Sequence, residues 1–335
     1  MIAPLLISLA LPPAPFAISP IKTLEGIRPV ALAAAPAGSL VAAALEDGTV
    51  RIFDAKTFRG VKNLAKHPQP AYAITWSSDG SLIATGDESA RIFIEDANTG
   101  RLIRQYRTHT KGIQKLSFNR DHSTLISTGK DDAIHVYDLK SPKAKQARII
   151  LGKGVNLYGA VFNPQALNLF AVGTLSAGGR VYDSNTGNTQ GFLTDPDQQG
   201  IFDASYNPAG TRLVTAGRDG SGMLWDAKKM SKLNGLRGHT DWVVNAIFSP
   251  NGNFVATSSS DRTVKIWNPY SFAKVAELPG ETAVGSPLCF TGDGAALITV
   301  NDAGFLQINS VTPAQPGHPV VTKAVKKKRR SRRMG

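Results

Sequence analysis

The stretch SSSDRTVKIWN, residues 258–268, decides the fold, because close versions of it recur along the chain. Each version has a polar turn residue, a short run that alternates apolar and polar residues, and a small polar residue at its end. The clearest other versions are AAALEDGTVRIFD (42–54), ISTGKDDAIHVYD (126–138) and VTAGRDGSGMLWD (214–226). The chain is therefore built from an internal repeat, which has to be defined before domains are assigned.

The repeat has a nearly constant length. Aligned on the final polar residue, seven units end at Asp54, Asp96, Asp138, Asp183, Asp226, Asn268 and Asn309. Seven positions before these ends stand Asp47, Ser89, Asp131, Ser176, Asp219, Asp261 and Asp302, in steps of 42, 42, 45, 43, 42 and 41 residues. This period indicates one repeat architecture rather than the two or three domains that a length of 335 residues suggests.

Each unit contains four short apolar runs separated by turn sequences such as SSDG (77–80), NPAG (207–210) and SPNG (249–252). Four strands of about five residues joined by such turns form a small antiparallel sheet. A sheet that is apolar on both faces must stack against neighbours, and a ring of stacked sheets has few open edges. We predict an all-β fold, a single seven-bladed β-propeller over residues 21–310 with four antiparallel strands per blade. The segment IKTLEG (21–26) is expected to supply the outer strand of the last blade and so to close the ring.

Residues 238–268, GHTDWVVNAIFSPNGNFVATSSSDRTVKIWN, resemble one unit of the WD-repeat family, and the resemblance extends over about residues 21–310. In that family a His, a Ser or Thr, an Asp and a Trp form a hydrogen-bonded set within each blade. The matching residues are His239, Ser259, Asp261 and Trp267. The resemblance implies that His239 donates to Asp261 and that Ser259 links the imidazole to the indole N–H of Trp267. We refer to such a set as the polar lock of a blade.

The other units keep the polar lock in part. His67 and His109 lie 22 residues before Ser89 and Asp131, the spacing of His239 to Asp261. The fifth unit has Asp219 and Trp225, with Asp197 at the histidine position. The first, fourth and seventh units have no histidine there, and the nearby residues are Glu25, Lys153 and Glu281. These departures weaken the expectation of a polar lock in those blades, but not the expectation of the blades.

The sequence points to no catalytic, metal or cofactor site. His239, Ser259 and Asp261 have the residue types of a nucleophilic triad, but their place in the repeat favours a structural role. Cys289 is the single cysteine, and the chain has no H-E-x-x-H motif, so zinc binding has no sequence support. The glycine pattern in GRDGSG (217–222) is followed by a strand pattern rather than by the helix that a dinucleotide site needs.

WD-repeat proteins commonly bind proteins or peptides on one face of the disc, so the resemblance implies a protein or peptide partner. The loops of that face include the residues just before the repeated turn position and those at the start of each inner strand. We therefore expect Trp242, Asp241 and Arg218 to form the centre of a binding surface, with Lys130, Glu46 and Glu88 around it. Trp242 stands where other units have Pro70, Gly112 and Gly200, so blade packing does not require an aromatic residue there.

A second hypothesis concerns the C-terminus. The last 13 residues hold eight Lys and Arg and no acid, which is most of the net charge of +13. We expect residues 311–335 to form a disordered basic tail that binds nucleic acid or another polyanion through Lys326, Lys327, Lys328, Arg329, Arg330, Arg332 and Arg333. The same composition also resembles a nuclear-localisation run. An enzyme on a propeller framework is the third hypothesis, and no residue cluster favours it.

The N-terminal segment MIAPLLISLALPPAPFA (1–17) leaves two interpretations open. Its apolar run of about ten residues has the length of a signal-peptide core and is too short to span a bilayer. Residues 1–20 are either a signal peptide or anchor, which would mean export, or a disordered apolar leader on a cytoplasmic protein. We expect no transmembrane span and a monomer in the absence of a partner.

Overall fold

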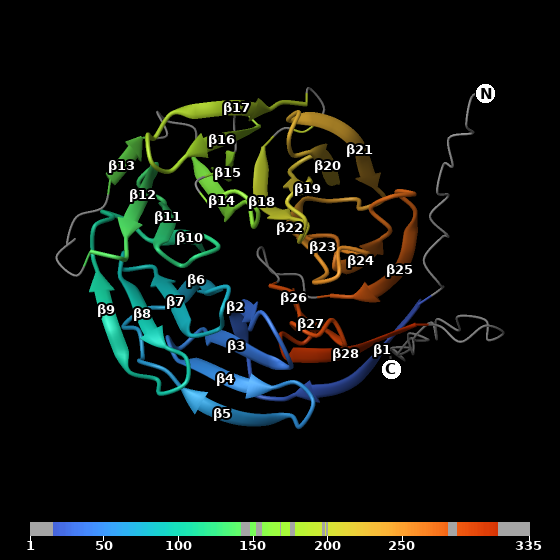
Figure 1. Cartoon of the computed structure of the whole chain (residues 1–335). Helices are drawn as coiled ribbons and strands as arrows, with labels where there is room; N and C mark the ends of the chain where they lie inside the picture. The colour runs from blue at the N-terminus through green and yellow to red at the C-terminus, as the bar shows by residue number, and fades with distance from the viewer. Residues whose placement is uncertain are drawn as a thin grey trace, which may run out of the picture.

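The computed structural model describes residues 16–141, 148–151, 156–167, 169–174, 178–195, 198, 200–280 and 287–313. In these residues 28 strands form seven four-stranded antiparallel sheets, and no helix occurs among them. The sheets are blades arranged around a central axis, with β2, β6, β10, β14, β18, β22 and β26 innermost (Figure 1). The prediction of an all-β, seven-bladed propeller is confirmed.

The blades are numbered in the chain order of their inner strands. The first three comprise β2 (Pro29–Ala34), β3 (Leu40–Leu45), β4 (Val50–Asp54) and β5 (Arg59–Asn63); β6 (Ala71–Trp76), β7 (Leu82–Asp87), β8 (Ile92–Asp96) and β9 (Leu102–Tyr106); and β10 (Ile113–Phe118), β11 (Thr124–Gly129), β12 (Ala133–Asp138) and β13 (Arg148–Leu151). The fourth and fifth comprise β14 (Leu157–Phe162), β15 (Leu169–Thr174), β16 (Gly179–Asp183) and β17 (Thr189–Leu193); and β18 (Ile201–Tyr206), β19 (Arg212–Gly217), β20 (Ser221–Asp226) and β21 (Ser231–Arg237). The last two comprise β22 (Val243–Phe248), β23 (Val255–Ser259), β24 (Thr263–Trp267) and β25 (Lys274–Pro279); and β26 (Cys289–Phe290), β27 (Ala296–Val300), β28 (Leu306–Pro313) and β1 (Phe16–Leu24).

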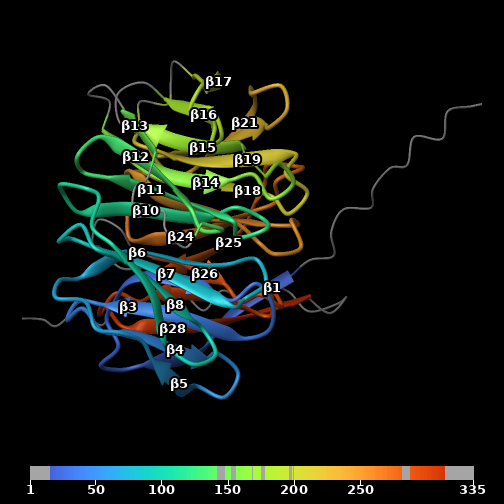
Figure 2. The same ribbon diagram turned by 60° about the vertical axis from the view of Figure 1, so that its left-hand side comes forward.

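The core lies between neighbouring blades, because each blade is apolar on both faces. In β3, Ala42 belongs to a buried cluster that includes Ile83 of the second blade. The next residue, Ala43, points to the opposite face and belongs to a cluster with Ile298 and Ile308 of the seventh blade. Figure 2 shows the resulting stack of sheets from the side. The alternation of a strand thus buries side chains against two different blades.

The two ends of the described chain close the ring. β1 pairs antiparallel with β28, from Phe16 opposite Pro313 to Leu24 opposite Leu306. The two strands lie side by side at the outer edge of the seventh blade (Figure 1). The predicted closure by the N-terminal strand is therefore confirmed. β1 begins at Phe16 and β28 ends at Pro313, so residues 16–20, which the sequence assigned to the leader, and 311–313, which it assigned to the tail, lie in these strands.

The remaining parts of the predicted leader and tail, residues 1–15 and 314–335, lie outside the described residues. Both therefore remain sequence-based hypotheses. No helix within the described part of the chain has the length and apolar character to cross a membrane.

Deleting residues 1–24 should destabilise the propeller, because β28 then loses its outer partner and the seam between the chain ends is no longer closed. We expect the deletion to lower the free energy of unfolding by a few kcal/mol, which corresponds to a fall of roughly 5–10 °C in the unfolding midpoint of a large domain. Thermal unfolding followed by circular dichroism measures it. The matched control is deletion of residues 314–335, which belong to no described strand and should leave the midpoint unchanged. Equal midpoints for all three proteins would contradict a stabilising role for β1.

Candidate functional site

The sixth blade holds the most complete polar lock. His239 Nδ1 lies 2.9 Å from Oδ2 of Asp261, and His239 Nε2 lies 2.8 Å from Oγ1 of Thr257. The indole N–H of Trp267 donates to the same Thr257 oxygen at 2.8 Å. A neutral imidazole protonated on Nδ1 satisfies every partner, since Thr257 then accepts from Trp267 and donates to His239. The lock ties the loop before β22 to β23 and β24.

Thr257, not Ser259, is the hydroxyl that connects the two rings, so the prediction for Ser259 was wrong. Ser259 Oγ donates to the backbone carbonyl of Asp241 at 3.0 Å and accepts from the backbone N–H of Asp261 at 3.1 Å. Residues 257 and 259 point to the same face of β23, because side chains alternate along a strand. Alternation alone therefore could not distinguish them, and the correct choice depends on how far each lies from Trp267.

The charges of this lock follow from its burial. Burial lowers the pKa of His239, and the hydrogen bond with Asp261 offsets only part of that effect. Burial raises the pKa of Asp261, but hydrogen bonds from Thr263, Thr240 and His239 outweigh it and bring the pKa to about 2. At neutral pH the lock therefore contains an ionised carboxylate and a neutral imidazole, which is a hydrogen-bonding arrangement rather than an ion pair.

The second blade builds a lock with its acid at a different position. His67 Nδ1 lies 3.0 Å from Oδ2 of Asp87, and His67 Nε2 lies 2.7 Å from Oγ1 of Thr85. Asp87 stands two residues before Ser89, the residue that occupies the usual acid position, and Ser89 donates to it at 2.9 Å. The tryptophan position holds Glu95, whose carboxylate accepts from the backbone N–H of Ala65 at 2.7 Å.

The fifth blade replaces the histidine with an amide. Trp225 donates to Oγ1 of Thr215 at 2.9 Å, and Thr215 donates to Oε1 of Gln198 at 2.8 Å. Asp219 bonds within its own turn, where it accepts from the Ser221 hydroxyl at 2.6 Å. Asp197, which the sequence placed at the histidine position, lies outside the described residues, as do Lys153 and Glu281.

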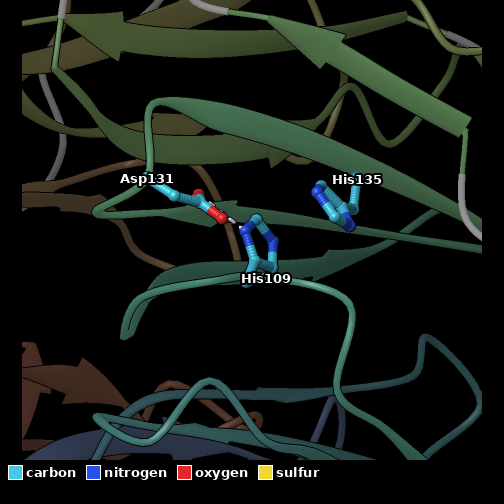
Figure 3. Close-up of side chains that lie close together, drawn as sticks. All are labelled: His109, Asp131 and His135. Atoms are coloured by element: carbon cyan, nitrogen blue, oxygen red, sulfur yellow. Dashed lines mark hydrogen bonds and ion pairs between the residues drawn. The ribbon is translucent and has the colours of Figure 1, made fainter.

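The polar lock of the third blade has a second histidine, His135, beside His109. His109 Nδ1 lies 2.8 Å from Oδ1 of Asp131, and His109 Nε2 lies 2.6 Å from the Ser127 hydroxyl. Figure 3 shows the Asp131 carboxylate directed at His109. The ring of His135 stacks on His109, with centroids 3.8 Å apart and planes inclined by 23°. His135 Nδ1 lies 2.8 Å from Oγ1 of Thr108.

His109, Asp131 and His135 bring potential metal-ligand atoms within 4.8 Å of one another. Their orientation does not suit a shared ion. An imidazole binds a metal through a lone pair in the plane of its ring, and the planes of two stacked rings run nearly parallel. Both nitrogens of His109 also have partners within the blade. The trio therefore fits a structural network.

A cavity of about 720 Å³ opens at the end of the channel where the inner strands begin, and residues from all seven inner strands line it. Six inner strands have a β-bulge near their start, and β-bulges redirect side chains. The residues at these bulges are Val30, Tyr72, Gln114, Tyr158, Phe202 and Val244, and all six line the cavity. We call this opening the channel mouth.

Aromatic rings form a row across one side of the channel mouth. Tyr158 and Phe202 meet edge to face with centroids 5.6 Å apart, and Phe202 lies 5.6 Å from Trp242. The guanidinium of Arg218 lies 5.1 Å from the centre of the Trp242 ring. Trp242 remains 37% exposed. We call Tyr158, Phe202, Trp242 and Arg218 the mouth cluster.

Of the other predicted binding residues, Lys130 lines the channel mouth, Glu88 pairs with it, and Asp241 adjoins Trp242. Lys130 Nζ lies 2.8 Å from both carboxylate oxygens of Glu88 and 5.9 Å from the centre of the Tyr72 ring. Asp241 accepts from the backbone N–H of Trp242 at 2.7 Å. Glu46 is exposed in the turn after β3 and is not among the residues that line the cavity.

Sequence reasoning missed Tyr72, Tyr158 and Phe202. The available signal was an aromatic residue at the second position of three inner strands. At that position an unbulged strand would direct the side chain into the inter-blade core, so the pattern resembled ordinary packing. The bulges place these residues at the channel mouth instead.

An ion pair crosses the channel wall below the mouth. Lys115 of β10 and Asp203 of β18 lie 2.8 Å apart, although the fourth blade separates their strands. The inner strand of that blade has Gly159 beside the pair, where a Cβ would lie only 2.7 Å from Cα of Asp203. Asp203 is buried, so its partner Lys115 balances its charge.

None of the described histidines lines the cavity, since three of them bond within polar locks. Cys289 lies in the wall, and burial raises the pKa of its thiol, which disfavours the nucleophilic thiolate. What the mouth presents is aromatic surface with cationic side chains beside it.

A family model described as WD domain, G-beta repeat matches residues 18–54, 59–94, 100–138, 187–226 and 230–268, which together make up more than half of the chain. Each match is displaced by one strand from the blades, as in 100–138, which contains the outer strand β9 and the three inner strands of the third blade. The fourth and seventh repeats, which lack the histidine, have little or no match. No curated protein matches the chain.

The stacked histidine of the third blade should make stability depend on pH. Burial, aided by His109, lowers the pKa of His135 to about 4, against about 6.5 in the unfolded chain. Between these values the unfolded state binds a proton that the folded state excludes, so the free energy of unfolding should fall as the pH drops from about 6.5 towards 4.

His135→Phe should reduce this pH dependence. Phe93 stacks on His67 in the second blade at 4.2 Å, so phenylalanine suits this position. Urea unfolding at a series of pH values measures the slope, and the comparison at pH 8 reports the packing cost alone, since neither state is protonated there. Equal slopes below pH 6.5 in both proteins would contradict a role for His135.

Proposed function

The chain belongs to the WD40 family of WD-domain, G-beta repeat proteins, and we propose that it is a non-catalytic scaffold whose channel mouth binds a protein or peptide. WD40 propellers generally serve as protein-interaction scaffolds. The proposed binding surface is the face of the disc on which the inner strands begin. The mouth cluster is the observation that carries it.

The mouth cluster has the composition of a binding hot spot. Trp, Tyr and Arg are the residue types that most often dominate binding energies, particularly near the centre of an interface. Trp242 leaves more than a third of its surface exposed, and Tyr72, on the other side of the mouth, is 45% exposed. Exposed apolar surface of this kind often marks an interaction site. The β-bulges of six blades direct further residues to the channel mouth.

The size of the cavity favours a peptide or a projecting loop. A volume of about 720 Å³ lies in the range of pockets that take small ligands or a few side chains. A folded partner would contact the rim and insert only one segment. The inner strands are held by hydrogen bonding within each blade and by packing between blades, so the mouth is formed before a partner arrives.

The non-catalytic part of the proposal rests on how the reactive side chains are used. The histidines of the polar locks make their hydrogen bonds inside the blades, and the Cys289 thiol is buried. The charged pair of the channel, Lys115 and Asp203, is mutually satisfied at 2.8 Å. None of these groups combines exposure to the cavity with a free acid or base.

Trp242→Ala should weaken partner binding by roughly 2 kcal/mol, about 30-fold, which is the hot-spot scale. Quantitative affinity capture with the full chain as bait, read by mass spectrometry, identifies the partner, and titration gives its affinity. The matched control is Tyr270→Ala. Tyr270 is 53% exposed and lies under Arg212 at 4.5 Å, but it stands at the opposite end of the strands. If Tyr270→Ala reduces partner binding and Trp242→Ala does not, the binding site lies outside the channel mouth.

A second candidate function rests on the sequence of the C-terminus, where eight Lys and Arg occur in 13 residues. Such a segment attracts polyanions through charge alone, and that attraction weakens with salt. Deletion of residues 323–335 should abolish retention on immobilised heparin at low salt. Arg218→Gln, which removes a cation from the channel mouth, should leave retention nearly unchanged. Retention that survives the deletion would transfer the polyanion site to the propeller.

A further inference from the structure

The channel mouth has three cationic side chains in its lining, and two of them are already neutralised. Lys115 pairs with Asp203, and Lys130 pairs with Glu88, each at 2.8 Å. Arg218 differs, because no carboxylate among the described residues lies within ion-pair distance of its guanidinium. The lining therefore carries one positive charge that has no counter-charge from the described part of the protein.

The contact with Trp242 leaves Arg218 ready to bind an anion. The guanidinium carbon lies 5.1 Å from the centre of the Trp242 ring, and a guanidinium has five N–H donors, so this contact leaves donors available to a ligand. Those N–H groups match the two oxygens of a carboxylate. Because the ring restrains the otherwise flexible side chain, less conformational entropy is lost when a ligand binds.

Apolar surface continues from this guanidinium into the cavity. The row of rings runs from Trp242 to Phe202 and Tyr158. Further along the inner strands the cavity wall includes Ile74 and Ile247, and Leu288 also belongs to it. A ligand that follows this surface meets a cation at the rim and an apolar wall further in.

We propose that the channel mouth binds a peptide segment in which a carboxylate stands beside an apolar or aromatic side chain. The carboxylate pairs with Arg218, and the apolar side chain lies against Phe202 and Tyr158. This inference rests on the proposed function and adds the chemistry of the partner. A basic segment would meet the uncompensated charge of Arg218. A phosphorylated or polyanionic ligand would need several unpaired donors, and of the three mouth cations only Arg218 lacks a partner among the described residues.

Selection from a displayed library of random peptides tests the proposal. The bait is the full chain, and peptides that also bind the Trp242→Ala variant are removed. We expect the remaining sequences to share Asp or Glu beside an apolar residue. The enriched peptide is then synthesised, together with a copy in which that Asp or Glu is changed to Asn or Gln, and both are titrated by calorimetry.

The two peptides and two protein variants separate the outcomes. Arg218→Gln should lower the affinity for the acidic peptide by at least about tenfold and should have little effect on the affinity for the amide copy. A charge-assisted hydrogen bond is lost only with the acidic peptide. Arg59→Gln, at an exposed arginine of β5 on the rim of the disc, should change neither affinity.

Three results would contradict the inference, and they differ in what else they affect. Enriched peptides that are basic or uncharged, or that bind Arg218→Gln as tightly as the unchanged chain, would overturn the acidic-peptide inference and leave the proposed function intact. If the library yields no peptide whose binding requires Trp242, both the acidic-peptide inference and the proposed function are contradicted. Equal weakening of the acidic and amide peptides by Arg218→Gln would show that Arg218 acts through packing rather than charge, and would also overturn the inference.

Discussion

The burial of both faces of every four-stranded sheet is the constraint on which the rest of the structure depends. A strand such as β3 directs Ala42 and Ala43 into clusters shared with two different neighbouring blades. No blade can therefore bury its apolar surface alone, and the array must return to its starting point. Pairing of β1 with β28 supplies that closure from segments nearly 300 residues apart in sequence. Closure in turn brings the starts of the inner strands around one channel.

The polar locks solve a second problem, the connection of each outer loop to the strands of its blade, and several residue types serve. The sixth blade uses His239, Thr257 and Trp267, while the fifth uses Gln198 in place of the histidine. The second blade moves the acid to Asp87. In each case a buried hydroxyl on the second strand of the blade forms a hydrogen bond with one or two side chains. A buried polar group without a hydrogen-bond partner in that position would destabilise the blade.

The channel mouth is made from residues that the packing of the blades does not use. Bulges at the starts of the inner strands release Tyr158 and Phe202 from the inter-blade core. The loops that follow β19 and precede β22 add Arg218 and Trp242. Beneath them, the ion pair between Lys115 and Asp203 passes Gly159 of the intervening blade. A rigid scaffold and a chemically specific surface thus occupy different positions of the same repeat.

The sequence by itself determined the number of blades and their strands, because a period of about 42 residues and the position of the turns are local properties of the chain. It also indicated the closure of the ring, because IKTLEG (21–26) resembles an outer strand. It also placed Trp242 and Arg218 on one face. Tertiary structure decided which hydroxyl completes the lock, Thr257 rather than Ser259, since both point to one face of β23 and only their distances to the rings differ. Tertiary structure also decided that Phe202 faces the channel. A bulge shifts the register between two strands, and that shift depends on their pairing rather than on the residue that it redirects.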